Sequence, residues 1–528
     1  MGSTLTLPAV QRAGQDRRQY SDPVVGAAFV TLLTAGALGI HGYHPYAEDG
    51  GLYMAGVKRL LNPALYPHWS EFVTEHLRFS LFAPLVAGLV RAIHLPLMTV
   101  WLLLYVASFW LTLFAAWLLA TRCYAGREAR CGAVALLAAW LTLPIAGTSL
   151  MLMDPYFSAR SISTPCALFA LVGLLDFMLP QADASNQRIR GLALCLASLA
   201  VAAVIHPLMA AYATGCILLL ACQFSNNRRT RIAGTFGLAL LAFVVAAILF
   251  STAQPESSAY RHVALTRTYW FVMRWQWYEQ LGLLGPFAIL VFLGLRSRSY
   301  SQAAIRALTR TGAIAGTVAI CIALLFARSN ASTYLVARLQ PLRIFQIVYI
   351  VMILALGAVL GEKLLQKKSY RWVMTFTLLA GVMIFAERQT FPHSAHLELP
   401  WSQPSNGWQR AFEWISTNTP RDGLFALDAH YVTQPGEDAQ TFRAIAERSA
   451  LADYSKDGGE ASITPALTTA WAIGQAAQTG LNEATDAARI AALRPLGVSW
   501  IVLPYSAVTG FPCSFSDEAV KVCRLPAR

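Results

Sequence analysis

The sequence is short of charged residues. Asp, Glu, Lys and Arg make up only 13% of its 528 residues, whereas 56% are hydrophobic. Soluble globular proteins carry about a quarter charged residues, so this composition excludes an ordinary soluble protein. We predict a membrane protein that crosses the bilayer many times.

Cysteine patterns that bind metals are also missing. None of the nine cysteines belongs to a CxxC or Cys/His pattern, and seven lie in or beside apolar runs as small core residues. Only Cys513 and Cys523 lie in the polar C-terminal part, where their ten-residue separation permits a disulfide if this part is extracytoplasmic. A cleavable signal peptide is not evident, because the first apolar run is long enough to stay as an anchor.

The positive charge forms no patch of the kind that binds nucleic acid. The net charge is +17 in residues 1–388 and −4 in residues 389–528. The basic residues of the first part lie in short loops between apolar runs, where the positive-inside rule places them. Because nucleic-acid binding needs a basic patch on a folded surface, we predict no nucleic-acid partner.

Twelve apolar runs organise the first part of the chain. They cover about residues 24–41, 79–95, 98–120, 130–150, 162–180, 191–205, 207–223, 232–252, 280–296, 311–327, 343–361 and 371–387. Basic clusters lie at the N-terminus (Arg12, Arg17 and Arg18) and in the loops near residues 122–130, 188–190, 228–231, 296–310 and 363–371. All of these clusters can be cytoplasmic if residues 79–120 cross the membrane a net one time.

We therefore interpret residues 79–95 as a re-entrant or membrane-hugging segment, which Pro84 and the break at His94-Leu95-Pro96 favour. The alternative is a further span, with a 121–130 loop that violates the charge rule. The fold class expected is mainly α: a polytopic transmembrane bundle of about 11–12 spans over residues 1–388 in the cytoplasmic (inner) membrane. Residues 42–78 form its first outer loop.

Residues 389–528 are expected to form a small extracytoplasmic α/β domain. Leu424 to Leu427 and Val498 to Leu503 read as buried strands, and the segments 408–415 and 482–493 read as helices. A domain of about 140 residues is large enough to have its own core.

Two adjacent carboxylates, Glu48 and Asp49, follow the first apolar run within the stretch from His41 to Tyr53. They repel each other and are partly desolvated beside the bilayer, which favours a raised pKa for one of them and suits a general base or a cation ligand. The following Gly50 and Gly51 permit a close backbone approach or a tight turn. The alternative is a helix N-terminus, where both acids offset the helix dipole.

The order of these parts resembles the GT-C superfamily of membrane glycosyltransferases, which use lipid-phosphate-linked sugars. The resemblance covers nearly the whole chain as architecture, and its residue-level motif is Glu48-Asp49. It implies that Asp49 (or Glu48) is the base that activates the acceptor in an inverting transfer, and that Asp154 matches the second acidic site of many GT-C enzymes. A clear Asp-x-Asp is missing from the first loop, which leaves open whether a divalent cation (Mg or Mn) takes part.

Other candidate substrate-binding residues lie in loops predicted on the same side. Asp154 and Arg160 stand six residues apart, and the alternative for them is a helix stop at Asp154-Pro155 with Arg160 capped by carbonyl groups. Arg261 and His262 lie among aromatic residues, which suits a phosphate and a sugar ring, or an interfacial aromatic belt.

Two arginines and one histidine complete the set of candidates. Arg338 and Arg343 flank the last of these loops, and Arg343 leads straight into apolar sequence, where a charge is costly unless it is paired. Arg343 therefore binds either the phosphate of a lipid-linked donor or an acid such as Asp154 or Asp49. His206, before Pro207, marks a turn between two runs and is included with the substrate-binding residues.

The sequence thus predicts an enzyme that transfers a sugar from a lipid-phosphate-linked donor to a glycan, lipid or protein acceptor at the outer face of the membrane. Its partners are then membrane lipid, the lipid-linked donor and the acceptor. Alternatives are a transporter or flippase of a lipid-linked or anionic substrate, and a non-enzymatic envelope-assembly protein. Inverted repeats would favour a transporter, and the sequence shows none.

Overall fold

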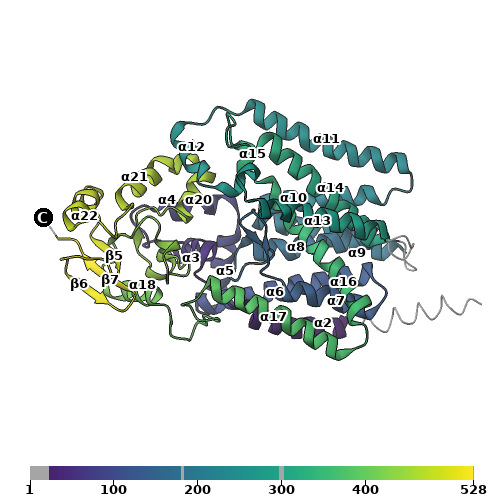
Figure 1. The fold of residues 1–528 in the computed structure, drawn as a ribbon, viewed down its shortest axis with the longest axis horizontal. Helices are drawn as coiled ribbons and strands as arrows, with labels where there is room; N and C mark the ends of the chain where they lie inside the picture. Colours follow the sequence, from purple (N-terminus) through teal and green to yellow (C-terminus); the bar gives the residue numbers. More distant parts are fainter. Residues whose placement is uncertain (1–22, 180–183, 297–302, 527–528) are drawn as a thin grey trace, which may run out of the picture.

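The computed structural model describes residues 23–179, 184–296 and 303–526. A bundle of long helices forms one end of the molecule, and a smaller domain with a β-sheet forms the other (Figure 1). In these ranges, nine helical segments are long and apolar enough to cross a membrane. They are α2 (Pro23–His41), α6 (Leu97–Cys123), α8 (Ala159–Met178), α9 (Ala184–Ile205), α11 (Arg228–Thr252), α13 (Trp277–Arg296), α14 (Ala303–Phe326), the segment Leu335–Leu365 around α16 (Phe345–Val359), and α17 (Ser369–Thr390).

Two shorter helices complete the bundle. α7 (Arg127–Ala139) and α10 (Pro207–Gln223) have 13 and 17 residues, and they pack against α16 and against α8 and α9, respectively. With them, the described part of the chain contains eleven bundle segments. The expected mainly α fold, a helical bundle followed by a small α/β region, is therefore confirmed, whereas the nine candidate spans of the described residues are fewer than the 11–12 expected.

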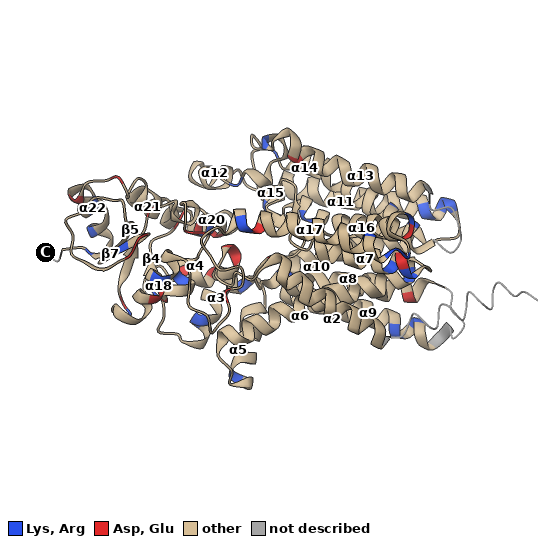
Figure 2. Ribbon diagram, turned by 60° about the horizontal axis from the view of Figure 1, so that its bottom comes forward, with Lys and Arg blue, Asp and Glu red and all other residues tan. Residues whose placement is uncertain are grey.

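The apolar run 79–95 forms no straight span. α4 (Glu71–Thr74) and η1 (Glu75–Phe79) meet α5 (Phe82–Ile93) at a bend of 98°. α5 has 12 residues, about 18 Å of helix, whereas the hydrocarbon core is about 30 Å thick. One face of α5 is buried, Leu85 on the other face is 53% exposed, and the helix stands away from the bundle in Figure 2. This geometry agrees with a membrane-hugging segment.

The run 130–150 is shorter as a helix than its apolar length indicates. α7 ends at Ala139, and the second half of the run forms a hairpin of β1 (Pro144–Ile145) and β2 (Leu150–Met151). Pro144 has no N–H to continue a helix, and Gly147 turns the chain at a φ of +69°. The hairpin brings the following residues, 152–158, to the surface that faces the C-terminal domain.

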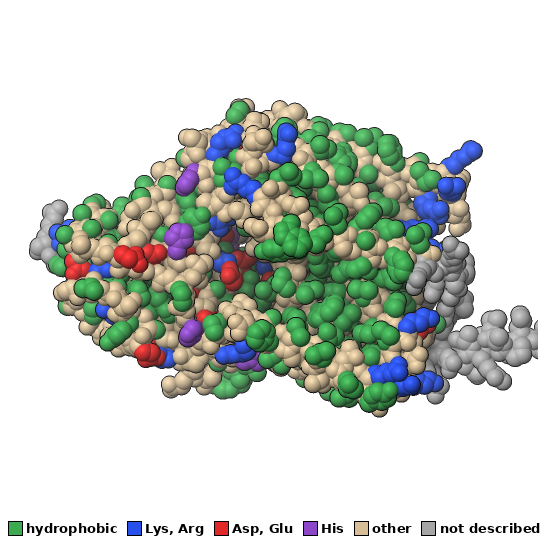
Figure 3. All heavy atoms as spheres, in the orientation of Figure 1, with side chains coloured by type: hydrophobic (Ala, Val, Ile, Leu, Met, Phe, Trp, Pro, Cys, Tyr) green, Lys and Arg blue, Asp and Glu red, His purple; other side chains and the backbone are tan. Residues whose placement is uncertain are grey.

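Charged residues mark the two ends of the bundle differently. Lys and Arg gather on the end that lies away from the C-terminal domain (Figure 2). Arg122 pairs there with Asp176 at 2.8 Å, and the bundle surface between the ends is largely hydrophobic (Figure 3). The basic residues Arg12, Arg17, Arg18 and Arg298 lie outside the described ranges.

The C-terminal domain is built on a five-stranded sheet with the order β4-β3-β5-β7-β6. Its strands are β3 (Leu424–Ala426), β4 (Ser449–Ala450), β5 (Trp500–Pro504), β6 (Cys513–Ser516) and β7 (Val520–Arg524). β4, β3 and β5 are parallel, whereas β7 and β6 are antiparallel and joined by the disulfide between Cys513 and Cys523. Helices α18 (Gly407–Asn418) and α22 (Asp486–Leu493) lie where the sequence predicts helices.

Residues 42–78, the loop that follows α2, lie between the bundle and this domain. Its main helix, α3 (Glu48–Leu61), packs against α19 (Phe442–Ala446), and Lys58 Nζ lies 2.7 Å from Glu447 Oε1. Further along the loop, the Tyr66 hydroxyl donates to the Arg443 carbonyl at 2.9 Å. The loop therefore fixes the position of the C-terminal domain relative to the end of the bundle that it covers.

Candidate active site

The N-terminus of α3 carries Glu48 and Asp49 into a cavity between the bundle and the C-terminal domain. Glu48 has a φ of +52°, its N–H donates to the Ala439 carbonyl, and its own carbonyl accepts from the Thr441 hydroxyl. Gly50 and Gly51 permit the close approach predicted from the sequence, because a Cβ on Gly51 would lie 2.3 Å from Thr441 Cβ. The two acids therefore owe their position to contacts with the distant domain.

The cavity has a volume of about 730 Å³. On the molecular face in Figure 3, acidic, basic and histidine side chains gather around a hollow where bundle and domain meet. Its polar walls include Glu48, Asp49, Asp154, Arg274, Glu279, Gln389, Thr433, Gln434 and Lys456, and its aromatic walls include Tyr156, Tyr269, Trp275 and Phe391. Aromatic faces beside hydroxyl, amide and charged groups suit a sugar better than an apolar ligand.

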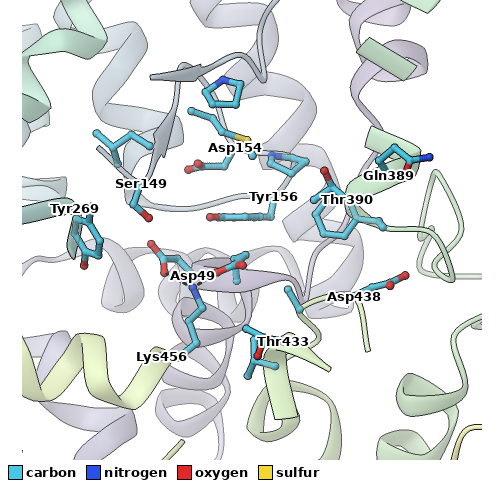
Figure 4. Close-up of a pocket in the computed structure, with 18 of the residues that line it drawn as sticks. Asp49, Ser149, Asp154, Tyr156, Tyr269, Gln389, Thr390, Thr433, Asp438 and Lys456 are labelled. Atoms are coloured by element: carbon cyan, nitrogen blue, oxygen red, sulfur yellow. Dashed lines mark hydrogen bonds and ion pairs between the residues drawn. The ribbon is translucent and has the colours of Figure 1, made fainter. Parts of the chain in front are cut away.

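Arg160 and Lys456 connect the acids of the cavity into one chain of ion pairs. Arg160 Nη2 lies 2.8 Å from Asp154 Oδ2, and Arg160 Nη1 lies 3.4 Å from Asp49 Oδ2. On the other side of Asp49, Lys456 Nζ lies 3.3 Å from Oδ1 and also pairs with Glu48. Figure 4 shows Lys456 pointing at Asp49 from the C-terminal domain, with Asp154 on the opposite wall.

Three nearby cations decide the protonation state of Asp49. Burial alone would raise its pKa, but Lys456, Arg160 and Arg343 outweigh burial and hold the pKa of Asp49 below its ordinary value. From the sequence, we predict a raised pKa for one of the two acids. The pKa of Asp49 is lowered instead, because the folded chain brings cations beside it that the sequence argument did not include. Asp49 is therefore ionised, and its side chain remains 35% exposed toward the cavity.

Arg343 and His206 lie near this network without lining the cavity. Arg343 Nε donates to Gln340 Oε1 at 2.7 Å, and the ion pairs of the described residues do not include Arg343. It lies within electrostatic range of Arg160 and Asp49, and of Tyr269 in the cavity wall. The expected alternative of a salt bridge to Asp154 or Asp49 is thus not formed. His206 joins α9 to α10 within electrostatic range of Arg343.

Three predicted substrate-binding residues lie elsewhere. Arg261 donates to the carbonyls of Ala331 and Ser332, and Arg338 pairs with Glu256 at 3.5 Å. His262 is exposed on α12 (Ser258–Leu265), beside Trp471.

None of these three lines the cavity. Arg261 and Arg338 hold the segments 253–279 and 328–342 together in this structure, and their substrate-binding role stays a prediction.

Lys456 is the cavity residue that sequence reasoning missed. It lies at the first position of α20 (Lys456–Ile463), in a region whose acids and lysines show no recognisable spacing. Arg267, which lies in the same aromatic stretch as Arg261, joins this stretch to the carbonyls of Tyr454 and Ser455 at 2.7 Å each.

A buried chain of histidines and glutamates ties the loop to the end of α17. His44 lies 2.8 Å from Glu398 Oε1 and 2.9 Å from Glu387 Oε1, and His396 lies 2.7 Å from Glu387 Oε2. His44 also stacks on Phe391, a wall residue of the cavity, with 3.9 Å between ring centroids. This cluster supports the wall and takes no part in the cavity itself.

The residues of the cavity fit a divalent cation poorly. Among the described residues, no group of three or more His, Cys, Asp and Glu side chains is arranged to hold a metal ion. The oxygens of Asp49 and Asp154 that a cation would need already face Arg160 and Lys456.

Comparisons with known proteins give distant structural likenesses. No protein-family model and no curated protein matches the chain. Among solved structures, the chain is similar to that of the arabinofuranosyltransferase AftD from Mycobacteria, with a TM-score of 0.42 and 15% sequence identity. The match covers 96% of this chain and 41% of the AftD chain, so this chain spans less than half of that enzyme's length.

Proposed function

We propose that this protein is a membrane glycosyltransferase of GT-C type, which transfers a sugar from a lipid-phosphate-linked donor to an acceptor hydroxyl. The observation that carries the proposal is the position of Asp49. It is an ionised carboxylate, half-exposed in a sugar-sized cavity that lies between a membrane bundle and its accessory domain. A general base must be ionised and within reach of the proton that it takes, and Asp49 is charged and open to the cavity.

In the proposed reaction, the acceptor oxygen attacks the anomeric carbon of the donor sugar. The bond between that carbon and the phosphate oxygen breaks, and the lipid phosphate leaves with the electron pair. The proton of the acceptor hydroxyl passes to Asp49. Attack from the face opposite the phosphate inverts the anomeric centre.

Arg343 is the proposed partner of the donor phosphate. A guanidinium matches phosphate geometry, and Arg343 has no acidic partner among the described ion pairs. It belongs to the apolar segment Leu335–Leu365, so a lipid-linked phosphate reaches it from within the membrane. Arg160 is less suited to this role, because Asp154 and Asp49 already engage its nitrogens.

The cavity is proposed to face the outside of the cytoplasmic membrane. Lys and Arg gather on the opposite end of the bundle, which the positive-inside rule places in the cytoplasm (Figure 2). The disulfide between Cys513 and Cys523 in the same domain supports an oxidising compartment.

Substitution of Asp49 tests the proposal. The purified protein in lipid nanodiscs is incubated with radiolabelled polyprenyl-phosphate pentoses and hexoses and with extracted envelope lipids and glycans. We expect Asp49→Asn to lower transfer at least about 100-fold, the scale of a lost general base. Lys58→Met, at a site outside the cavity, is the control for folding. Normal transfer by Asp49→Asn would contradict the proposed function.

A further inference from the structure

The segment that carries Lys456 is held in place from the bundle side. Its two preceding carbonyls, Tyr454 O and Ser455 O, each accept a hydrogen bond of 2.7 Å from the guanidinium of Arg267. Arg267 is itself buried and belongs to the loop that leads to the cavity residue Tyr269. The backbone entering Lys456 is therefore tied to the membrane domain.

The same segment is held a second time from within the C-terminal domain. The Lys456 N–H donates to Asp453 Oδ1 at 2.6 Å, and the fully buried Asp457 accepts two hydrogen bonds from Arg443 at 2.7 and 2.8 Å. Asp457 also accepts from the Asp453 N–H at 2.8 Å. A lysine that served only solubility would need none of these anchors.

A role in holding the C-terminal domain against α3 does not explain the position of Lys456. Lys58 has that role and serves as a comparison. Lys58 Nζ donates to Glu447 Oε1 and to the Ala444 carbonyl, both at 2.7 Å, and it also joins α3 to the C-terminal domain. Both lysines are similarly buried, with side chains 14% and 13% exposed. Lys58 lies outside the cavity, whereas Lys456 lines it and contacts both acids.

We infer that Lys456 is a positioning residue, by which the C-terminal domain holds the Asp49 carboxylate ionised and aimed into the cavity. The inference rests on the proposed function, in which Asp49 is the base. Arg160 also contacts Asp49, at 3.4 Å, but its shorter contacts of 2.8 and 3.1 Å go to Asp154 on the bundle side.

The other groups around Asp49 include acids, arginines, histidines and phenols. From their electrostatic coupling, they are Tyr53 and Glu48 on α3, His76 on η1, Asp154, Tyr156 and Arg160 from the α8 side, Arg343 and His206 from the bundle, and Glu460 on α20. Burial and the neighbouring Asp457 and Asp49 raise the pKa of Glu460 to about 8. Without Lys456, Asp49 would therefore face acids and phenols together with two arginines, one of which is engaged by Asp154.

The pH dependence of transfer tests this inference. The rate needs ionised Asp49, so the acidic limb of the profile of kcat/KM reports its pKa. With the radiolabelled polyprenyl-phosphate sugar that the wild-type protein accepts, we expect Lys456→Met to move this limb upward by about one pH unit or more. Lys456→Arg, which keeps the charge, should restore it at least in part. The control Lys58→Met breaks the other lysine contact between α3 and the domain and should leave the limb in place.

Two outcomes separate this inference from the proposed function. If Asp49→Asn abolishes transfer but the Lys456→Met limb coincides with that of the wild type, Lys456 is only a docking contact and the inference is wrong. If Asp49→Asn is fully active, the proposed function fails first. Unfolding temperatures of Lys456→Met and Lys58→Met, measured in parallel, show whether lost activity reflects lost folding; a folded, inactive Lys456→Met that Lys456→Arg does not rescue would also overturn the inference.

Discussion

Lys456 and Asp49 are separated by 407 positions in the chain, but their side chains lie 3.3 Å apart. The contact joins the helix that follows the first span to a helix of the C-terminal domain. Because the cavity lies between these two parts, neither the bundle nor the domain contains a complete site by itself. The domain is therefore part of the site, in addition to covering it.

Substitution of Asp154 should destabilise the protein, because Asp154 pairs with a buried arginine. Asp154→Asn would leave the buried Arg160, whose side chain is 6% exposed, without its closest partner. Breaking one side of a buried ion pair costs about 3–5 kcal/mol, which should appear as a lower unfolding temperature in detergent. Asp176→Asn, which breaks the more exposed pair with Arg122, should have a smaller effect. Equal decreases in unfolding temperature would show that the pair of Asp154 and Arg160 contributes no more to stability than the pair of Asp176 and Arg122.

Arg343 should control the affinity for the donor. Arg343→Gln removes a cation that has no acidic partner in the described ion pairs, so the unfolding temperature should change little. The KM for the lipid-phosphate sugar should rise about tenfold or more, as expected for a lost charged hydrogen bond. Arg338→Gln is the matched control, because it breaks the pair with Glu256 away from the cavity. It should lower stability and leave the KM unchanged.

The sequence predicts the acids of the site better than its cations. Asp49 and Asp154 stand out because acids are rare beside the membrane, and Arg160 because it lies close to Asp154 in sequence. Lys456 gives no such signal, since only the folded chain brings it to α3. Arginines among aromatic residues look alike whether they bind a phosphate or carbonyl groups, so the sequence could not show that Arg261 and Arg338 lie outside the cavity.

Helix content is predicted better than helix length. Hydrophobicity identifies all the bundle segments, because it reports burial in lipid or in protein. It does not show that the run 130–150 ends as a hairpin, since Pro144 and Gly147 are also tolerated within membrane helices. Pro84 and the break at His94-Leu95-Pro96 indicate a membrane-hugging segment, but they do not predict the bend of 98° that precedes α5.

Chelation of divalent cations should leave sugar transfer unchanged. The carboxylate oxygens of Asp49 and Asp154 face Arg160 and Lys456, which supply the positive charge that a metal would otherwise bring. We expect transfer in the presence of EDTA to equal transfer with added Mg²⁺ or Mn²⁺. Loss of activity on chelation, with recovery on addition of one of these ions, would show that the cations rearrange when substrate binds.

The histidine cluster behind the cavity should make stability depend on pH. For His44, burial lowers the pKa, but hydrogen bonds to Glu387 and Glu398 outweigh it and raise the pKa above its ordinary value. A raised folded-state pKa gives stability that is fully present below the unfolded value of about 6.5 and is lost as the pH rises through the folded value. The unfolding temperature should therefore fall toward alkaline pH.

His44→Gln should flatten this pH dependence and lower stability mainly at acidic pH. His262→Gln, at an exposed histidine on α12, is the control and should follow the wild type. Thermal unfolding measured across neutral pH checks both variants. A pH dependence that persists unchanged in His44→Gln would assign it to another group.

Gly51 should be required for the position of Asp49. A Cβ at this site would lie 2.3 Å from Thr441 Cβ and 2.6 Å from the Tyr46 carbonyl, closer than real contacts allow. Gly51→Ala must therefore push α3 away from the C-terminal domain and lengthen the distance between Asp49 and Lys456. We expect a loss of transfer that exceeds the loss of stability, measured as kcat and as unfolding temperature in the same preparation.

Two further variants decide whether the contact with Thr441 is the cause. Gly36→Ala, on α2, introduces a Cβ with no atom within 4 Å and should be neutral. Adding Thr441→Gly to Gly51→Ala removes one of the two clashes and should restore part of the transfer rate, although the Tyr46 carbonyl still restricts α3. If Gly51→Ala alone is as active as Gly36→Ala, the close approach of α3 to the domain is not needed to place the base.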